Sequence, residues 1–279
     1  MFIRQALNNL IRQIRSLSLD IVAGALAVSF FFSSLFGSEL PLLYWIALGF
    51  TVWLVYMVDH FADSYLPGSY NNKQEVIQLR SYRKLLGRLS ILVALILIVI
   101  TFLLPFKIVI FGLAGVLFMI GYTVLNQVQN YSVKAFFPRE PVIALFYILG
   151  TAGIPLIYNP DIRSEHLIFI LALFLLILTN TFIFACIDYE HDLRAGTKTI
   201  AIRTGPGLTR IIGIITCLTG SAILIWLSRI DALYSHSMVG LCMAAPLFLI
   251  LLILKDSNKK YLAIFVDLVL LFPFVLLFL

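Results

Sequence analysis

An apolar run leads directly into a cluster of acids in residues 166–205, which read HLIFILALFLLILTNTFIFACIDYEHDLRAGTKTIAIRTG. The apolar part, residues 166–187, is long enough to cross the roughly 30 Å of hydrocarbon in a bilayer as a helix. The acids Asp188, Glu190 and Asp192 then lie where that helix leaves the membrane. Because the helix dipole disfavours anions at a C-terminus, we expect a bound cation beside them.

The rest of the chain has the same apolar character. Of its 279 residues, 61% are hydrophobic and 12% are charged, whereas soluble domains have about 25% charged residues. We therefore predict an all-α, polytopic membrane protein with a single domain over residues 1–279. The three cysteines form no CxxC motif, which favours packing roles for them.

Nine apolar runs are long enough to be membrane spans. They cover residues 18–36, 41–58, 90–105, 108–125, 141–157, 166–187, 208–228, 237–254 and 260–279. Pro105 is the only strong helix-breaking residue between the third and fourth runs. Acids follow the second and the sixth runs, so we predict a four-helix unit used twice, in spans 1–4 and 5–8, with a ninth span added.

The basic residues indicate how these spans are oriented. With a cytoplasmic N-terminus, 17 of the 20 Lys and Arg residues lie on the cytoplasmic side, and only Lys107, Arg163 and Arg229 lie opposite. This bias follows the positive-inside rule. It predicts an integral protein of the inner or plasma membrane, with its acids in the cytoplasm and its C-terminus on the opposite side. The charges are spread over five loops, which argues against a nucleic-acid partner.

Two acidic pairs share one spacing and one topological place. Asp59 and Asp63 follow the second run, and Asp188 and Asp192 follow the sixth. Residues four apart share a helix face. Mg²⁺ commonly combines one or two carboxylates with substrate phosphates. We therefore predict that the pairs face one another across a cavity and bind Mg²⁺.

The second pair begins a longer motif, DxxxDxxxGxxT, which continues as IAIRTG to Gly205. This motif resembles the second aspartate-rich motif of the UbiA superfamily of intramembrane prenyltransferases. The resemblance implies nine helices around a central cavity, with two such motifs facing the cytoplasm. The family's first motif is usually NxxxDxxxD; Asp59 and Asp63 fill its aspartate places, and Val55 stands in place of the asparagine.

The resemblance also implies a reaction. A prenyl group passes from a polyprenyl diphosphate to a lipid-soluble acceptor, aromatic or otherwise small and hydrophobic, within the membrane. Two Mg²⁺ ions would neutralise the diphosphate as it leaves. The candidate catalytic and metal-binding residues are Asp59, Asp63, Asp188 and Asp192.

Basic residues are expected to contact the diphosphate as well. Lys134 lies where the family generally carries a diphosphate-contacting lysine or arginine, and Lys198 lies inside the second motif. Arg15, just before the first span, is a candidate by position. Each of the three could instead serve only as a positive-inside topology marker.

Two polar residues lie within expected spans. Asn180 could line the cavity or hydrogen-bond a neighbouring helix. Asp267 is a lone acid in the ninth run, and intramembrane acids are functional candidates. Neither has a role assigned by the motif.

Other functions fit parts of this pattern. CDP-alcohol phosphotransferases also use aspartates on membrane helices, but neither pair here has the glycines of their D-G-x2-D motif. An ion-coupled transporter would suit paired acids, although transporter sites usually lie near the membrane midplane. A catalytically inactive, isoprenoid-binding homologue would be compatible with Val55 in the first motif.

Overall fold

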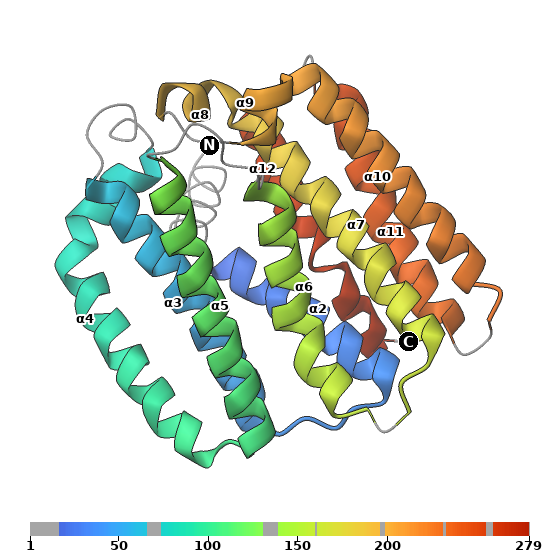
Figure 1. Ribbon diagram of the computed structural model, residues 1–279, viewed down its shortest axis with the longest axis horizontal. Helices are drawn as coiled ribbons and strands as arrows, with labels where there is room; N and C mark the ends of the chain where they lie inside the picture. The colour runs from blue at the N-terminus through green and yellow to red at the C-terminus, as the bar shows by residue number, and fades with distance from the viewer. Residues whose placement is uncertain are drawn as a thin grey trace, which may run out of the picture. The chain divides into compact units, whose positions relative to one another are not determined.

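The computed structural model describes most of the chain, and all of its regular elements are helical (Figure 1). The described residues are 17–65, 74–130, 139–159, 161–195, 199–230, 233–254 and 259–278. Within these, only the backbone is described at residues 59–65, 74–83, 123–130, 195, 259–261 and 276–278. The prediction of an all-α fold is confirmed for the described residues.

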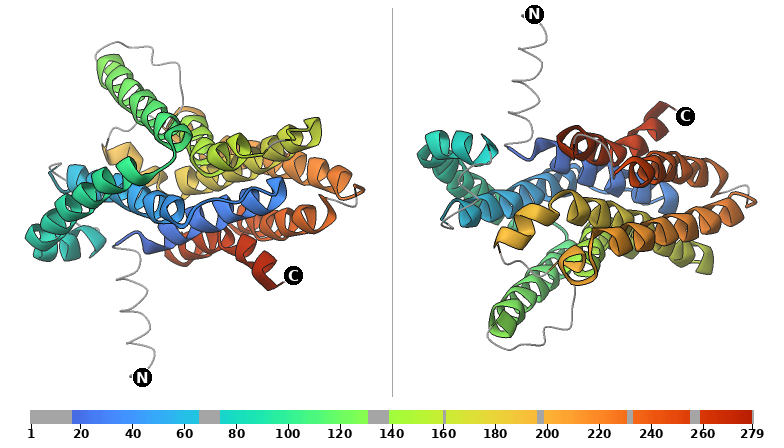
Figure 2. Two further views of the ribbon diagram at one scale, coloured as in Figure 1. Left: turned by 90° about the horizontal axis from the view of Figure 1, so that it is seen from below. Right: turned by 90° about the horizontal axis from the view of Figure 1, so that it is seen from above.

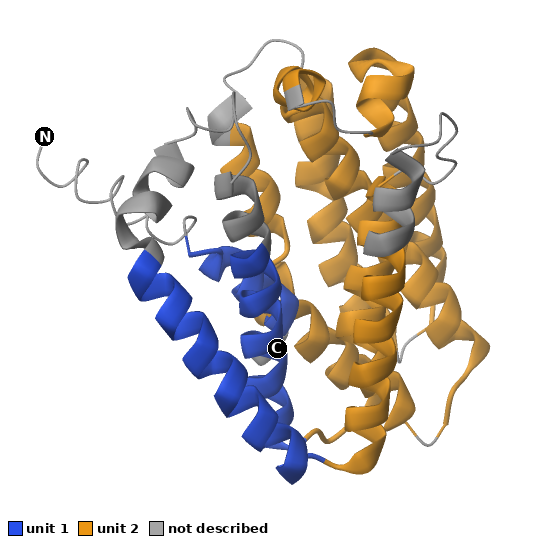
Figure 3. Ribbon diagram, turned by 60° about the vertical axis from the view of Figure 1, so that its left-hand side comes forward, with its two compact units in different colours: residues 1–26, 41–104 blue, residues 27–40, 105–279 orange. Residues whose placement is uncertain are grey.

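The chain divides into two compact units (Figure 3). The first comprises residues 1–26 and 41–104, and the second comprises residues 27–40 and 105–279. Helix α2 (Leu19–Phe36) begins in the first unit and ends in the second.

In the first unit, α3 (Leu42–Tyr65) packs against α4 (Gln74–Leu103). The start of α2 approaches α3 at Gly49, where a Cβ atom would lie 3.7 Å from Val22 and from Leu26. Only 11% of the apolar window Lys84–Leu103 is buried. Side chains of this kind are suited to contact with lipid, which is as apolar as they are.

The second unit is built around α7 (Ser164–Ile187), the helix formed by the long apolar run of residues 166–187. Two helices, α6 (Arg139–Ile157) and α10 (Pro206–Leu227), pack against α7, and α11 (Tyr234–Ile253) packs against both α7 and α10 (Figures 1 and 2). The core around α7 includes the fully buried side chains of Phe169, Leu173, Leu176 and Ile183.

Helix α5 (Phe106–Asn130) joins this unit through aromatic contacts with α6. The rings of Phe118 and Phe146 lie 4.9 Å apart between their centroids. Nearer the start of α5, the Phe111 ring occupies the space that a side chain on Gly153 would fill. Glycine is therefore required at this position for the ring to lie against α6.

The first eight predicted spans each coincide with a helix. The division between the third and fourth spans is confirmed, because α4 ends at Leu103 and α5 begins at Phe106, on either side of Pro105. Within the described residues, six helices are long and apolar enough to cross a membrane, and two shorter apolar stretches belong to α3 and α5. The total of nine spans stays a prediction.

The ninth run differs from the prediction, because it is not one continuous α-helix. Helix α12 (Lys259–Val269) has 11 residues, and a 3₁₀ helix, η3 (Phe272–Phe278), follows it. Pro273 has no N–H to donate to the carbonyl of Val269, which disfavours an α-helix at this position, although α11 continues through Pro246. The run is apolar throughout, which is why hydropathy alone predicted a single span.

Candidate active site

The acidic turn of the second motif begins where α7 ends. Asp188 is the C-terminal cap of α7, and its N–H donates to the Phe184 carbonyl at 2.9 Å. The short helix α8 (Tyr189–Ala195) follows, and the Asp192 N–H donates to the Asp188 carbonyl at 2.8 Å. This bond continues one helical turn across the break in the helix. The two acids are therefore one turn apart, as their spacing predicted.

Asp192 lies in a largely enclosed place for a carboxylate. Its side chain is 10% exposed, whereas the residue Asp188 is half-buried. The Nδ1 atom of His191 lies 3.9 Å from Oδ1 of Asp192. Burying a carboxylate is costly unless its charge is compensated. The turn therefore favours a positive partner, whether a protonated histidine or a metal ion.

The chain returns from this turn to the membrane through α9 (Ile200–Thr204), which lies with α8 at one end of α7 and α10 (Figure 1). Thr199 caps α9, since its Oγ1 accepts from the Ile202 N–H at 3.4 Å. Gly205 then adopts a φ of +83°, in the region that favours glycine, and Pro206 opens α10.

The residues that precede and follow this segment lie close together. The Cys186 thiol lies 3.5 Å from the Pro206 carbonyl, to which it donates. Beside it, Thr209 Oγ1 donates to the Gly205 carbonyl at 2.9 Å. The motif is therefore a loop that leaves and re-enters the helical bundle at one place, with the acids near its start.

Glu140 also belongs to this site, and sequence reasoning missed it. It lies in the first turn of α6, is 3% exposed, and accepts from the Ile200 N–H at 3.1 Å on one carboxylate oxygen and 3.2 Å on the other. The charge of Asp192 is close enough to act on it. An acid just before an apolar run resembles any interfacial residue, so the sequence contains no sign of a partner 60 residues away.

Several predicted site residues lie beyond what is described. Asp59 and Asp63 lie on α3, in the first unit, and their side chains are outside the described residues. Arg15, Lys134 and Lys198 are outside the described residues altogether. The predicted meeting of the two acidic pairs across a cavity, and the three diphosphate contacts, stay predictions.

The donor atoms at the second turn suit a hard divalent cation. Asp188 and Asp192 offer carboxylate oxygens at the end of a membrane helix, and Mg²⁺ is commonly bound by one or two carboxylates together with phosphate oxygens and waters. Among the described residues, no three His, Cys, Asp or Glu side chains are grouped so that they could hold a metal by themselves. The described turn therefore fits Mg²⁺ bound jointly with a phosphorylated substrate.

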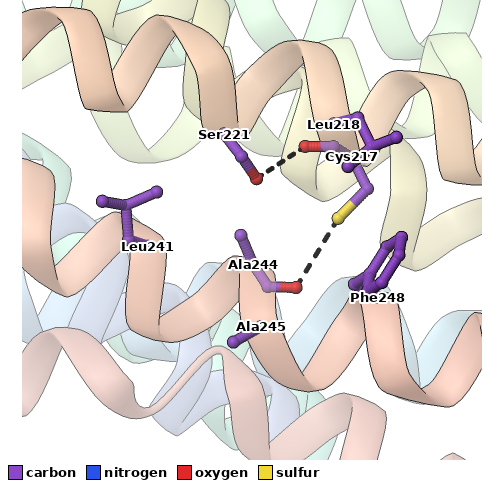
Figure 4. Close-up of a pocket in the computed structure, with 7 residues that line it drawn as sticks. All are labelled: Cys217, Leu218, Ser221, Leu241, Ala244, Ala245 and Phe248. Atoms are coloured by element: carbon purple, nitrogen blue, oxygen red, sulfur yellow. Dashed lines mark hydrogen bonds between the residues drawn. The ribbon is translucent and has the colours of Figure 1, made fainter.

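A cavity of about 220 Å³ lies elsewhere, between α10 and α11 (Figure 4). It is lined by Cys217, Leu218, Ser221, Leu241, Ala244, Ala245 and Phe248, none of which is charged. Cys217 lies about 16 Å along α10 from Pro206, at 1.5 Å per residue. This lining has no basic group to neutralise a diphosphate, so we separate the cavity from the acidic turn.

The structure decides between the two interpretations of Asn180. Its Nδ2 atom donates to the Val266 carbonyl at 3.2 Å, and the residue is buried. Asn180 therefore bonds a neighbouring helix, α12. Asp267 is the next residue on α12 and is half-buried.

Comparisons with known proteins agree with this architecture. A sequence model of the UbiA prenyltransferase family matches residues 79–274, and one of the SIS3 N-terminal domain matches residues 17–133. A search of curated proteins found no match.

Two solved structures are similar to the whole chain. The apo structure of a UbiA homologue from Aeropyrum pernix K1 has a TM-score of 0.59 at 13% identity, covering 92% of this chain and 98% of its own. A structure of digeranylgeranylglyceryl phosphate synthase has a TM-score of 0.51 at 14% identity, covering 98% of each chain. These likenesses show the fold. Because the family match extends over most of the sequence, this chain is a membrane protein that belongs to the UbiA prenyltransferase family and has a prenyltransferase-type function.

Proposed function

We propose that this protein catalyses the Mg²⁺-dependent transfer of a prenyl group from a polyprenyl diphosphate to a lipid-soluble acceptor in the membrane. The observation that carries the proposal is the second acidic turn. Asp188 and the buried Asp192 are held one helical turn apart within the region that matches the family.

In this reaction, the bond between the first prenyl carbon and the diphosphate oxygen breaks, and pyrophosphate leaves with the electron pair. The acceptor supplies the electron pair for the new bond to that carbon and loses a proton. Mg²⁺, when bound, neutralises the charge that develops on the leaving group. Asp188 and Asp192 would hold this ion. We propose that Asp59 and Asp63 do the same from α3.

Basic residues complete the proposed diphosphate site. We assign this contact to Lys134, Lys198 and Arg15, as the family resemblance and their positions indicate. The positive-inside bias supports a site on the cytoplasmic side, because all three lie in cytoplasmic segments of the proposed topology.

The proposal leaves the acceptor at the level of its chemical class. One structural neighbour is named as a synthase of a glyceryl phosphate lipid, and its 14% identity to this chain supports a shared fold alone. An aromatic or other small hydrophobic acceptor is compatible with a reaction inside the bilayer.

The test uses purified protein with Mg²⁺, a panel of polyprenyl diphosphates and candidate acceptors. We expect release of pyrophosphate and formation of a prenylated lipid. Asp188→Ala and Asp59→Ala should each lower the rate at least about 100-fold, the scale for removing one group that stabilises developing charge. Asp161→Ala, in the connection between α6 and α7, is the matched control and should keep wild-type activity.

The other outcomes are informative. Activity that survives both Asp59→Ala and Asp188→Ala would exclude the proposed metal clamp. Diphosphate binding without turnover would instead identify an inactive, isoprenoid-binding homologue. Ion-gradient-driven uptake in proteoliposomes without pyrophosphate release would identify a transporter.

A further inference from the structure

A buried acid outside the motif holds the motif's return segment. Glu140 is the second residue of α6, and Ile200 is the first residue of α9. Both carboxylate oxygens of Glu140 accept from the Ile200 N–H. The first N–H groups of any helix lack partners within that helix. The Thr199 hydroxyl accepts from the Ile202 N–H, and Glu140, on a different helix, accepts from the Ile200 N–H.

This arrangement is costly in isolation. Glu140 is 3% exposed as a whole residue, so its carboxylate loses most of its hydration. The nearby charge of Arg139 favours the Glu140 carboxylate, whereas that of Asp192 is of the same sign and opposes it. Hydrogen bonds to a charged acceptor are stronger than neutral ones, so the bond to Ile200 offsets part of this cost. A neutral side chain at the start of α6 would avoid the repulsion altogether.

The bond connects directly to the acidic turn. Helix α9 packs against α8, which carries Asp192, and against α7, which Asp188 caps. A tie at the first residue of α9 therefore restrains the segment on which both acids depend. Outer partners of this kind orient the groups that hold a metal, and removing them typically weakens metal affinity or activity about 10- to 100-fold.

We propose that Glu140 is a positioning residue for the diphosphate site, acting through its bond to the Ile200 N–H, which fixes α9 and with it the Asp188 and Asp192 carboxylates. The inference rests on the proposed function. Glu140 itself need not touch the substrate or the metal.

The bond can be removed from either side. Glu140→Ala removes the acceptor. Ile200→Pro removes the donor, and the backbone suits proline there, because Thr199 has the φ of −90° and ψ of 161° that a residue before proline adopts and proline is favoured at the first position of a helix. Ile200→Ala keeps the N–H and measures the loss of the side chain alone. Glu165→Ala, at a half-buried acid in the first turn of α7, is the control for removing a charge.

The readout is binding of inorganic pyrophosphate in the presence of Mg²⁺, measured by calorimetry on the full-length protein in detergent. Glu140→Ala should weaken binding about tenfold or more relative to wild type, and Ile200→Pro should do so relative to Ile200→Ala. The double variant should be no weaker than the single ones, because both changes remove the same bond. Glu165→Ala should bind like wild type.

A structural role alone gives a different result. In that case the variants melt at lower temperature but bind pyrophosphate with unchanged affinity, and the inference is overturned. Losses of affinity that add up in the double variant overturn it as well. If Glu140→Ala does not yield folded protein, Glu140→Gln replaces it, since its amide oxygen still accepts from Ile200. Binding by Glu140→Gln closer to wild type than to Ile200→Pro supports the inference, and an equal loss contradicts it.

The experiment also separates this inference from the proposed function. Wild-type protein that binds pyrophosphate and Mg²⁺ while the variants are unaffected overturns the inference alone. Wild-type protein that binds neither overturns both.

Discussion

At the scale of single residues, one amide supports the end of the last α-helix. In a continuous helix, the Val266 carbonyl would accept from the Leu270 N–H. Here the Leu270 N–H donates to the Asp267 backbone carbonyl instead, at 3.2 Å. The Asn180 side chain donates to the Val266 carbonyl in its place. A buried carbonyl inside a membrane has no water to replace such a bond. Asn180 therefore makes the break in the ninth run tolerable.

We predict that Asn180→Leu lowers the midpoint of thermal unfolding in detergent. The change leaves the Val266 carbonyl without this donor, which costs about 1–3 kcal/mol. Thr181→Val is the control, because the Thr181 hydroxyl bonds its own helix, at the Leu178 carbonyl. Equal midpoints for the two variants would show that the bond to α12 contributes nothing specific.

The residue scale also shows what the sequence can predict. The turn from Asp188 to Asp192 was predictable, because it depends on spacing within one short segment. The partners of Glu140 and Asn180 lie 60 and 86 residues away and accept or donate through backbone groups. Almost any residue has those backbone groups, so the sequence does not indicate which residue is the partner.

At the scale of helices, the contact between α5 and α6 depends on one glycine. The Phe111 ring lies where a Cβ atom on Gly153 would be, whereas Gly150, one turn earlier on α6, has nothing within 4 Å of its Cβ position. Both are glycines of the same helix, so they form a matched pair. Only one of them is required by packing.

We therefore predict opposite effects for two alanine substitutions in α6. Gly153→Ala should displace the Phe111 ring and destabilise the protein by about 1–3 kcal/mol, as overpacking does. Gly150→Ala should be neutral or stabilising, because alanine loses less backbone entropy on folding than glycine. Thermal unfolding of the two purified variants measures the difference. A loss at Gly150 as large as at Gly153 would contradict the prediction, because helix propensity favours alanine at both positions and only Gly153 faces the Phe111 ring.

Hydropathy predicted most helices because a span must satisfy its own backbone and present apolar side chains along its whole length. Eight runs obey this rule. The ninth has the composition of a span, but its α-helix ends at Val269. Near that end, Asn180 of α7 donates to the Val266 carbonyl, and composition does not report such a bond between helices.

At the scale of the whole molecule, the break in the ninth run bears on which side of the membrane the chain reaches at Leu279. Helix α11 packs against α12 and also against η3, so α12 and η3 both lie along α11. Eleven α-helical residues and seven 3₁₀ residues together span about 30 Å, which is the thickness of the hydrocarbon core. The interrupted run is therefore long enough to cross the membrane.

We predict that Leu279 lies on the side opposite to the acidic turns. Alkaline phosphatase fused after Leu279, in a bacterial host, should be active, and a fluorescent protein fused there should be dark, since the first works only outside the cytoplasm and the second only inside. The same reporters fused after Leu254, the C-terminal cap of α11, should give the reverse result. If both positions report the cytoplasm, α12 and η3 form a hairpin that returns to the starting side, and the 17 cytoplasmic basic residues must be explained with eight spans.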